Sequence, residues 1–199
     1  MISGKTVRQR LLLLIAIVWT AAAQAQHPTA SQALGLSAFG GVTGVFTGLE
    51  GGKNLSFTAG VDLAFPPLYR MFRPTFEVRG KFPMDGGTIV SQKDIMGGAR
   101  VDVLLGRRYH PYGDFLFGRG QMDYQNGGFV FNNFQYELTT TYVWSAGGGV
   151  DYDLNDNFSV KADGQYQHWG SAPTTSGSLY STSVTLGVVY RFNFNHHHR

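Results

Sequence analysis

The sequence has no cysteine, few charged residues and no long apolar run. Without cysteine, no disulfide can brace the fold, and no lipid can be attached to a cysteine near the N-terminus. A charged fraction of 15% argues against a disordered chain or a coiled coil, since both are rich in charge. Because no apolar run approaches the roughly 20 residues of a membrane-spanning helix, a helical membrane protein is excluded. Glycine (27 residues) and aromatic residues (14%) are abundant instead, and 199 residues suit one domain, which favours an all-β protein.

The N-terminal region has the layout of a secretory signal peptide. Basic residues precede the short apolar run 11–18, and small residues ending in an A-x-A pattern at 23–25 follow it. We therefore expect a cleaved signal peptide over 1–25. Its three basic residues are Lys5, Arg8 and Arg10, so 13 Lys and Arg would remain against 13 Asp and Glu. The pI of 9.2 thus gives no support for nucleic-acid binding.

The rest of the chain alternates apolar and polar residues with a period of two, as half-buried strands do. In residues 55–65, for example, Phe57 and Val61 share one face while Thr58 and Asp62 share the other. The segments have about 9 to 14 residues, close to the length of a tilted membrane-spanning strand. Eight such segments are expected, at 34–42, 55–65, 74–82, 94–105, 112–122, 137–152, 158–167 and 184–194.

The connections between these segments alternate in length. Long polar or glycine-rich connections are expected at 43–54, 83–93, 123–135 and 169–178, and shorter turns at 66–72, 107–110 and 154–156. Long loops on one side and short turns on the other are typical of an outer-membrane barrel with both termini on the turn side. The sequence therefore predicts an eight-stranded antiparallel up-and-down transmembrane β-barrel over 26–194, followed by a short tail at 195–199.

A soluble lipocalin-like barrel has the same period with its apolar face inside, so the direction of each face needs separate evidence. Glycine, serine and threonine are frequent on the polar face, and small residues suit the narrow interior of an eight-stranded barrel. Aromatic residues gather near both ends of the strands, as in the girdles of membrane barrels. Both features favour an apolar face that contacts lipid. One exception is Arg119, which shares a face with Phe115 and Phe117 and requires a bulge or an interfacial position.

The charged residues at mid-strand would then lie in the lumen, where they must be paired. Four acids balance four bases, and the spacing predicts a Glu77–Arg100 pair. Lys161 and Asp163 are expected near it across the lumen. The expected network consists of Asp62, Glu77, Arg79, Lys81, Arg100, Asp102, Lys161 and Asp163.

These features resemble the small OmpA-like outer-membrane β-barrel proteins. The resemblance is carried by the signal peptide, the eight alternating segments, the stretches 144–152 and 158–163, and the closing segment 187–194. It implies insertion into the outer membrane by the barrel-assembly machinery, which reads an aromatic-ended last strand. Tyr190, Phe192 and Phe194 match that signal, although five further residues follow Phe194. The cell-wall anchoring of longer relatives is not implied, because no peptidoglycan-binding domain follows.

Candidate chemistry outside the lumen is sparse. An outer-membrane enzyme that modifies lipid A would use a Ser/His pair near the outer leaflet, for which His168, Ser171 and Glu137 are the candidates. The H-x-x-S spacing in a loop fixes no geometry, and a lone interfacial histidine is more often solvated. A metal site at His196–His198 is disfavoured against a solvated tail. Gly147–Gly149 lacks the helix and lysine of a phosphate loop.

We therefore expect no catalytic site, cofactor or metal. The expected role is a structural component of the envelope, exported to the outer membrane, with contacts to outer-membrane lipid and with long loops available to an extracellular ligand. A narrow pore and a lipid A-modifying enzyme remain the alternatives. A salt-bridged plug is favoured over a pore, because an eight-stranded barrel has little room inside.

Overall fold

The computed structural model describes residues 34–68, 71–85, 87, 89–105, 108–125, 128–131, 133–172 and 174–192. The expected signal peptide, the tail and Phe194 lie outside these residues. Within the described ranges, the structure contains no helix with the length and apolar character that a membrane crossing requires.

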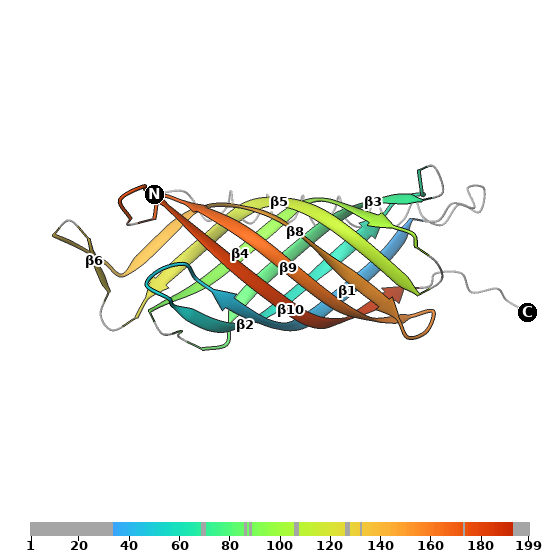
Figure 1. Cartoon of the computed structure of the whole chain (residues 1–199), viewed down its shortest axis with the longest axis horizontal. Coiled ribbons are helices and arrows are strands. Elements are labelled where there is room, and N and C mark those ends of the chain that lie inside the picture. Colours follow the sequence, from blue (N-terminus) through green and yellow to red (C-terminus); the bar gives the residue numbers. More distant parts are fainter. Residues whose placement is uncertain are drawn as a thin grey trace, which may run out of the picture. The chain divides into compact units, whose positions relative to one another are not determined.

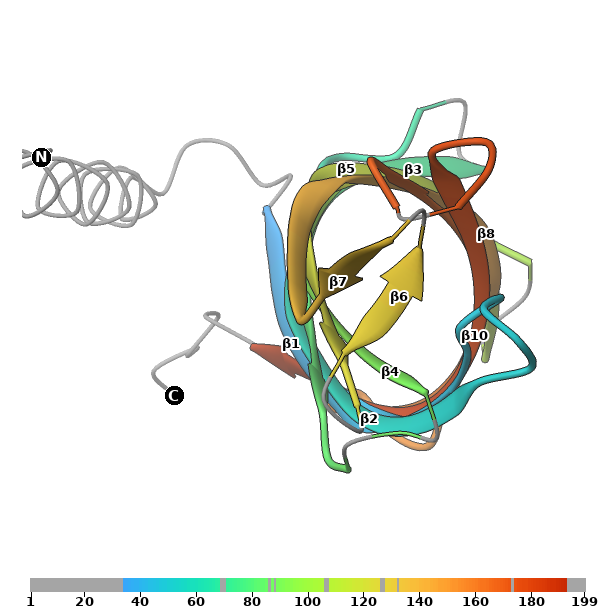
Figure 2. The ribbon, with the colours of Figure 1, turned by 90° about the vertical axis from the view of Figure 1, so that its left-hand side faces the viewer.

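Eight antiparallel strands close into a single barrel, which confirms the predicted fold class (Figures 1 and 2). Consecutive strands are neighbours, and β1 and β10 close the barrel by pairing from Leu36 opposite Phe192 to Phe46 opposite Thr182. The strands cross the barrel at a marked tilt (Figure 1). They are β1 (Gly35–Phe46), β2 (Lys53–Ala64), β3 (Phe72–Pro83), β4 (Val90–Val103), β5 (Tyr109–Tyr124), β8 (Leu138–Asp153), β9 (Phe158–Gly170) and β10 (Ser178–Phe192).

The sequence did not predict a small hairpin that forms between β5 and β8. It consists of β6 (Phe129–Phe131) and β7 (Phe134–Tyr136), which pair only with each other. Asn133 at its turn has a φ of 65°, a conformation that asparagine tolerates better than most residues. The hairpin extends beyond the rim of the barrel, at the end opposite to the start of β1 and the end of β10 (Figure 1).

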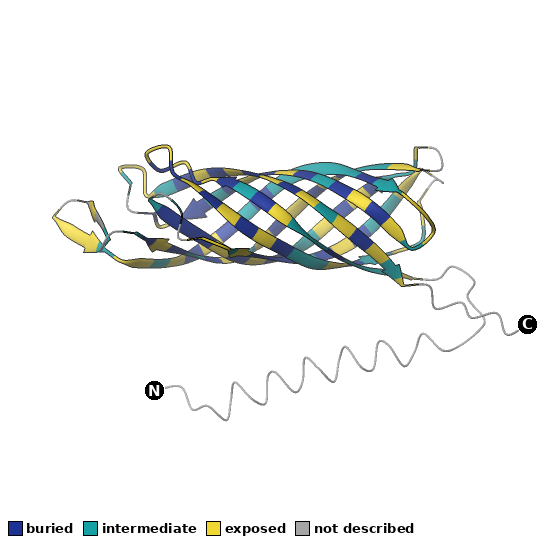
Figure 3. Ribbon diagram, turned by 90° about the horizontal axis from the view of Figure 1, so that it is seen from below, coloured by how far each residue is buried: buried dark blue, intermediate teal, exposed yellow. Residues whose placement is uncertain are grey.

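Alternation along the strands places apolar side chains outside and charged side chains inside. Phe57 and Val101 are 44% and 43% exposed on the outer wall, whereas Arg79 and Lys161 are 3% and 1% exposed. Figure 3 shows this pattern as alternating buried and exposed positions along each strand. The face that the sequence assigned to lipid is therefore the outer surface of the barrel.

The predicted strands are present in the predicted order, and all but β8, which is only shifted by one residue, are longer than predicted. The connections shrink from 43–54 to 47–52 and from 169–178 to 171–177. The strands continue past the apolar belt, where outward residues such as Lys53 and Thr182 are polar and the alternation fades. The stretch 125–137 is the longest of the described connections, so the expected contrast between long loops and short turns is weaker than predicted.

Arg119 lies on the outer wall, and no bulge turns it inward. The β4–β5 register runs without interruption from Val90 opposite Tyr124 to Asp102 opposite Tyr112. Arg119 is opposite Ile95 on β4 and Tyr142 on β5's other neighbour, β8. Of the two explanations that the sequence left open, the structure excludes the bulge.

Close packing inside the barrel gives a test of the fold at Gly120 on β5. A Cβ atom there would lie 2.3 Å from the ring of Trp169, which is fully buried and cannot move aside. We expect Gly120→Val to lower the free energy of unfolding by about 1–3 kcal/mol, the usual cost of overpacking. Urea unfolding in lipid vesicles, followed by the unheated gel shift of the folded barrel, measures this change.

The matched control is Gly44→Val on β1. A Cβ at Gly44 meets no atom within 4 Å. Valine also has the better strand propensity, so this variant should be neutral or slightly more stable than the parent chain. Equal losses in the two variants would contradict the packing described here.

Candidate functional site: the charged interior of the barrel

Period-two alternation in β2, β3, β4 and β9 delivers the charged residues to the interior. Every residue of the expected network is buried there: Asp62, Glu77, Arg79, Lys81, Arg100, Asp102, Lys161 and Asp163. Their arrangement forms two arginine-centred clusters and two lysine sites.

The first cluster surrounds Arg79 on β3. Its Nε donates to Glu77 Oε1 on the same strand, and its Nη1 donates to Asp163 Oδ1 on β9 at 2.9 Å. Asp114 Oδ2 on β5 lies 3.4 Å from Nη2. One guanidinium thus bridges three strands across the lumen, because its fixed fork of donors serves several carboxylates at once.

The second cluster surrounds Arg100 on β4. Its guanidinium donates to Asp102 Oδ1 at 2.8 Å and to Asp151 Oδ2 on β8 at 2.6 Å. Asp62 Oδ2 accepts a further bond at 3.3 Å. Glu77 Oε2 lies 3.6 Å from Arg100 Nη1, which is the pair expected from the sequence, and it links the two clusters.

The lysines are held differently. Lys81 Nζ lies 2.9 Å from Asp94 Oδ2 and donates to the side-chain oxygen of Gln167. Lys161 Nζ is 3.9 Å from Asp151 Oδ1 and makes no hydrogen bond among the described residues. It lies 4.4 Å from the ring centroid of Phe39 and 4.5 Å from that of Tyr112. The quadrupoles of two aromatic rings therefore add cation–π attraction to its interactions with the carboxylates.

The interior contains more acid than the sequence prediction included. Asp94, Asp114 and Asp151 are buried and take part in the ion pairs. All three could have been identified, because each has the same parity as the inward residues of its strand. Four buried bases therefore face seven buried carboxylates: Asp62, Glu77, Asp94, Asp102, Asp114, Asp151 and Asp163. This composition makes the interior more favourable for cations than for anions.

Sequence reasoning missed an apolar layer in the half of the lumen nearer to the β6–β7 hairpin. Trp169 is fully buried at its centre, and its indole N–H donates to Ser181 Oγ at 3.0 Å. Lys81 Nζ lies 5.8 Å from the Trp169 ring centroid, so the charged layer begins next to the apolar one. The layer comprises Leu49, Val90, Met96, Leu116, Met122, Tyr124, Val143, Trp169, Ala172 and Leu179.

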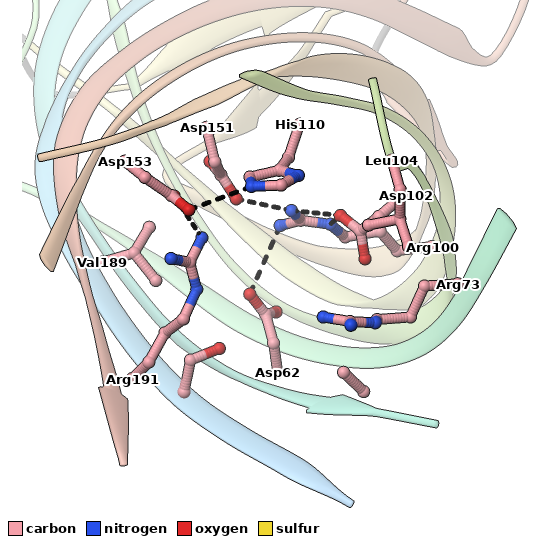
Figure 4. Close-up of a pocket in the computed structure, with 12 residues that line it drawn as sticks. Asp62, Arg73, Arg100, Asp102, Leu104, His110, Asp151, Asp153, Val189 and Arg191 are labelled. Atoms are coloured by element: carbon pink, nitrogen blue, oxygen red, sulfur yellow. Dashed lines mark hydrogen bonds and ion pairs between the residues drawn. The ribbon is translucent and has the colours of Figure 1, made fainter. Parts of the chain in front are cut away.

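A cavity of about 190 Å³ lies at the other end, where the strands meet the short turns. Its wall includes Arg73, Arg100, His110, Asp153 and Arg191 (Figure 4). Asp153 accepts from Arg191 Nη2 at 2.7 Å and lies 2.9 Å from His110 Nε2. The cavity is thus a charged vestibule that ends at the Arg100 cluster.

The candidates for acyl-transfer chemistry do not form a catalytic arrangement. His168 lies on the outer wall, with its ring centroid 5.2 Å from that of Trp144 and 5.0 Å from that of Tyr180. Ser171 and Glu137 are exposed, and no hydrogen bond joins either of them to His168 in the part of the chain that the structure describes. The structure therefore brings together aromatic rings around His168 rather than a nucleophile and its base.

The aromatic residues of the expected assembly signal lie at the end of β10. Tyr190 and Phe192 are exposed on the outer wall, and their ring centroids are 5.0 Å apart. Tyr190 also contacts Phe158 across the β9–β10 pair, at 5.1 Å. These positions are compatible with recognition by the barrel-assembly machinery, which stays a prediction.

The Arg79 cluster gives a test of the buried network. Arg79→Met would leave Glu77, Asp163 and Asp114 without their shared cation, and we expect it to lower the free energy of unfolding by about 3–5 kcal/mol. Urea unfolding in lipid vesicles measures this loss. As a control, Arg108→Met removes an exposed cation whose guanidinium donates to the Tyr152 hydroxyl, and it should leave the free energy of unfolding nearly unchanged. An equally small change for Arg79→Met would show that the interior is hydrated and the network dispensable.

Comparison with known proteins places this architecture in a family. Among solved structures, the chain is similar to Neisserial surface protein A (NspA), with 14% identity and a TM-score of 0.52, over 80% of this chain and 97% of that one. It is also similar to Ail, the attachment invasion locus protein of Yersinia pestis, crystallised with the heparin analogue sucrose octasulfate. That match has 16% identity and a TM-score of 0.51, over 80% of this chain and 100% of Ail. At these identities the similarity shows the fold alone.

No curated protein matches the chain by sequence. The family model for the outer membrane protein beta-barrel domain, however, matches residues 11–192, which is most of the chain. The chain therefore belongs to the outer membrane protein β-barrel family and is a protein of the outer membrane.

Proposed function

We propose that this protein is a non-conducting, non-catalytic barrel that serves as a structural component of the outer membrane and displays its β6–β7 hairpin at the cell surface. The observation that carries the proposal is the filling of the lumen by two successive layers. An apolar layer around Trp169 occupies the extracellular half, and the ion-paired clusters occupy the middle.

The two layers oppose conduction for different reasons. An ion that enters the apolar layer loses most of its hydration shell, and the few buried polar side chains at that height, such as Gln92 and Ser181, replace only part of it. An ion that enters the charged layer must displace a guanidinium from carboxylates on several strands, since Arg79 links three strands and Arg100 links four. The vestibule at the short-turn end therefore supports a dead end rather than one mouth of a channel.

The hairpin supports a role at the surface. Val130 and Phe134 are each 68% exposed, so the segment presents apolar side chains beyond the rim instead of covering the barrel. Exposed apolar side chains at such a site are suited to contact with another molecule. We propose that a partner outside the cell would meet this hairpin first.

Conductance across a planar bilayer tests the closed lumen. We expect the wild-type protein to give no steady conductance above that of the lipid. Trp169→Ala combined with Met122→Ala removes two fully buried side chains of the apolar layer and should raise the conductance. The control is Trp144→Ala, a tryptophan on the outer wall, which should leave the baseline unchanged. Steady cation-selective steps from the wild type would contradict the proposal and favour the narrow pore.

Mass spectrometry of lipid A tests the absence of catalysis. We expect the acyl composition to be the same in cells that lack the protein, cells that produce it, and cells that produce His168→Ala. His168 is packed between aromatic rings and has no hydrogen bond to Ser171 or Glu137 among the described residues, so it is not positioned as a base. An acyl chain lost or added with the wild type, but not with His168→Ala, would favour the enzyme.

A further inference from the structure

Two cations interrupt the outer wall directly above its apolar belt. On β5 the outward residues run from Phe115 and Phe117 to Arg119, and on β4 they run from Ile95 to Lys93. In both strands the cation follows the last apolar outward residue on the way to the β6–β7 end of the barrel. That end is the extracellular one, because it lies opposite the start of β1 and the end of β10 and carries the longest of the described connections.

The strand register brings the two cations together. Lys93 is opposite Gln121 on β5, and Ile95 is opposite Arg119. Lys93 and Arg119 are therefore diagonal neighbours on the same face, about 7–8 Å apart at the backbone and within reach of long side chains. Gln121 is on the same face, opposite Lys93 and two residues from Arg119, so an ammonium, a guanidinium and an amide can converge on one group.

Neither cation is neutralised by the protein. Both Lys93 and Arg119 are exposed, and the structure gives neither of them an ion pair or hydrogen bond within its described residues. The buried bases, by contrast, all lie beside carboxylates. Asp123 also faces outward, two residues beyond Gln121, and the register makes it the other diagonal neighbour of Lys93. No ion pair joins Asp123 to Lys93 among the described residues.

The neighbouring aromatic residues mark the depth of the pair. Arg119 is opposite Tyr142, whose ring stacks on Phe117 at 6.5 Å. Trp144 and His168 continue this aromatic band around the outer wall. Tyrosine and tryptophan prefer the boundary between hydrocarbon and water, so Lys93 and Arg119 lie at the level of the lipid headgroups.

We propose that Lys93, Arg119 and Gln121 form a binding site for a phosphate group of an outer-leaflet glycolipid. A guanidinium can bind phosphate through two parallel hydrogen bonds, and an ammonium adds a compact charge. A phosphomonoester carries up to two negative charges, which matches two unpaired cations. The site lies on the outer wall and is independent of whether the lumen conducts.

Lipid titration followed by native mass spectrometry tests the site. The folded protein in detergent micelles is titrated with bisphosphorylated lipid A, with its monophosphorylated form and with phosphatidylglycerol. Each lysine or arginine near a charged lipid contributes enough for a roughly fivefold change in affinity. We therefore expect the Lys93→Gln, Arg119→Gln double variant to bind bisphosphorylated lipid A at least about tenfold more weakly.

Lys53→Gln is the matched control. Lys53 is also an exposed, outward cation at the extracellular end, but it lies on β2 over the ring of Phe46. Its removal should change the affinity by less than about twofold, since it lies outside the proposed site. The unheated gel shift confirms that each variant is folded. If the double variant does not fold, the affinities of the wild type for the three lipids test the site instead.

Three outcomes would overturn the site. If the double variant binds bisphosphorylated lipid A as strongly as the wild type, Lys93 and Arg119 do not contribute to binding. An equal loss of affinity in Lys53→Gln would show that the effect comes from general surface charge and not from a site. Wild-type affinity that is equal for phosphatidylglycerol and bisphosphorylated lipid A would show attraction to any anionic lipid. A loss confined to the double variant, together with a preference for two phosphates, supports the assignment.

Discussion

The backbone of this protein can satisfy its hydrogen bonds in hydrocarbon only if the sheet has no edge. No water is available there to pair with a free N–H or C=O group, and each unpaired group costs several kcal/mol. The β1–β10 pairing, which joins two strands that are about 140 residues apart in sequence, is the contact that removes both edges. An even number of strands lets this last pair be antiparallel. The other features of the barrel follow from that closure, because a closed wall has two faces with different solvents.

The inner face of a closed eight-stranded wall leaves little room, so its occupants must fit and must be paired. Arg79 and Arg100 meet this requirement by bonding carboxylates on several strands at once. Their ion pairs hold opposite sides of the wall together. The cost of desolvating so many charges offsets much of the stability that these pairs contribute. The apolar layer around Trp169 provides contacts that need no pairing. The interior is therefore stabilised by two kinds of contact at two heights.

Much of this was predictable from the sequence. The number of strands, their order and the direction of their faces follow from the period of two, because a side chain such as Phe57 or Arg79 has only two faces available. The ends of the strands were not predictable, since alternation fades where both faces are polar, as near Lys53. The third carboxylate of the Arg79 cluster, Asp114, was missed because β5 mixes apolar and charged residues on its inner face. The β6–β7 hairpin was missed because it pairs only with itself and shares no register with the barrel.

Residues that break the alternation show where the surroundings of a face change along a strand. Leu116 and Met122 are apolar residues on the inner face of β5, and together with Trp169 they belong to the apolar layer of the lumen. Arg119 is the reverse case, a cation on the outer face of the same strand. In a continuous hydrocarbon environment an unpaired guanidinium would be strongly unfavourable. Its presence, with a regular register and no bulge, therefore places Arg119 near the end of the hydrocarbon, within the reach of its side chain to the headgroups. The strand β5 therefore carries part of the apolar layer on its inner face and the residue that marks the edge of the membrane on its outer face.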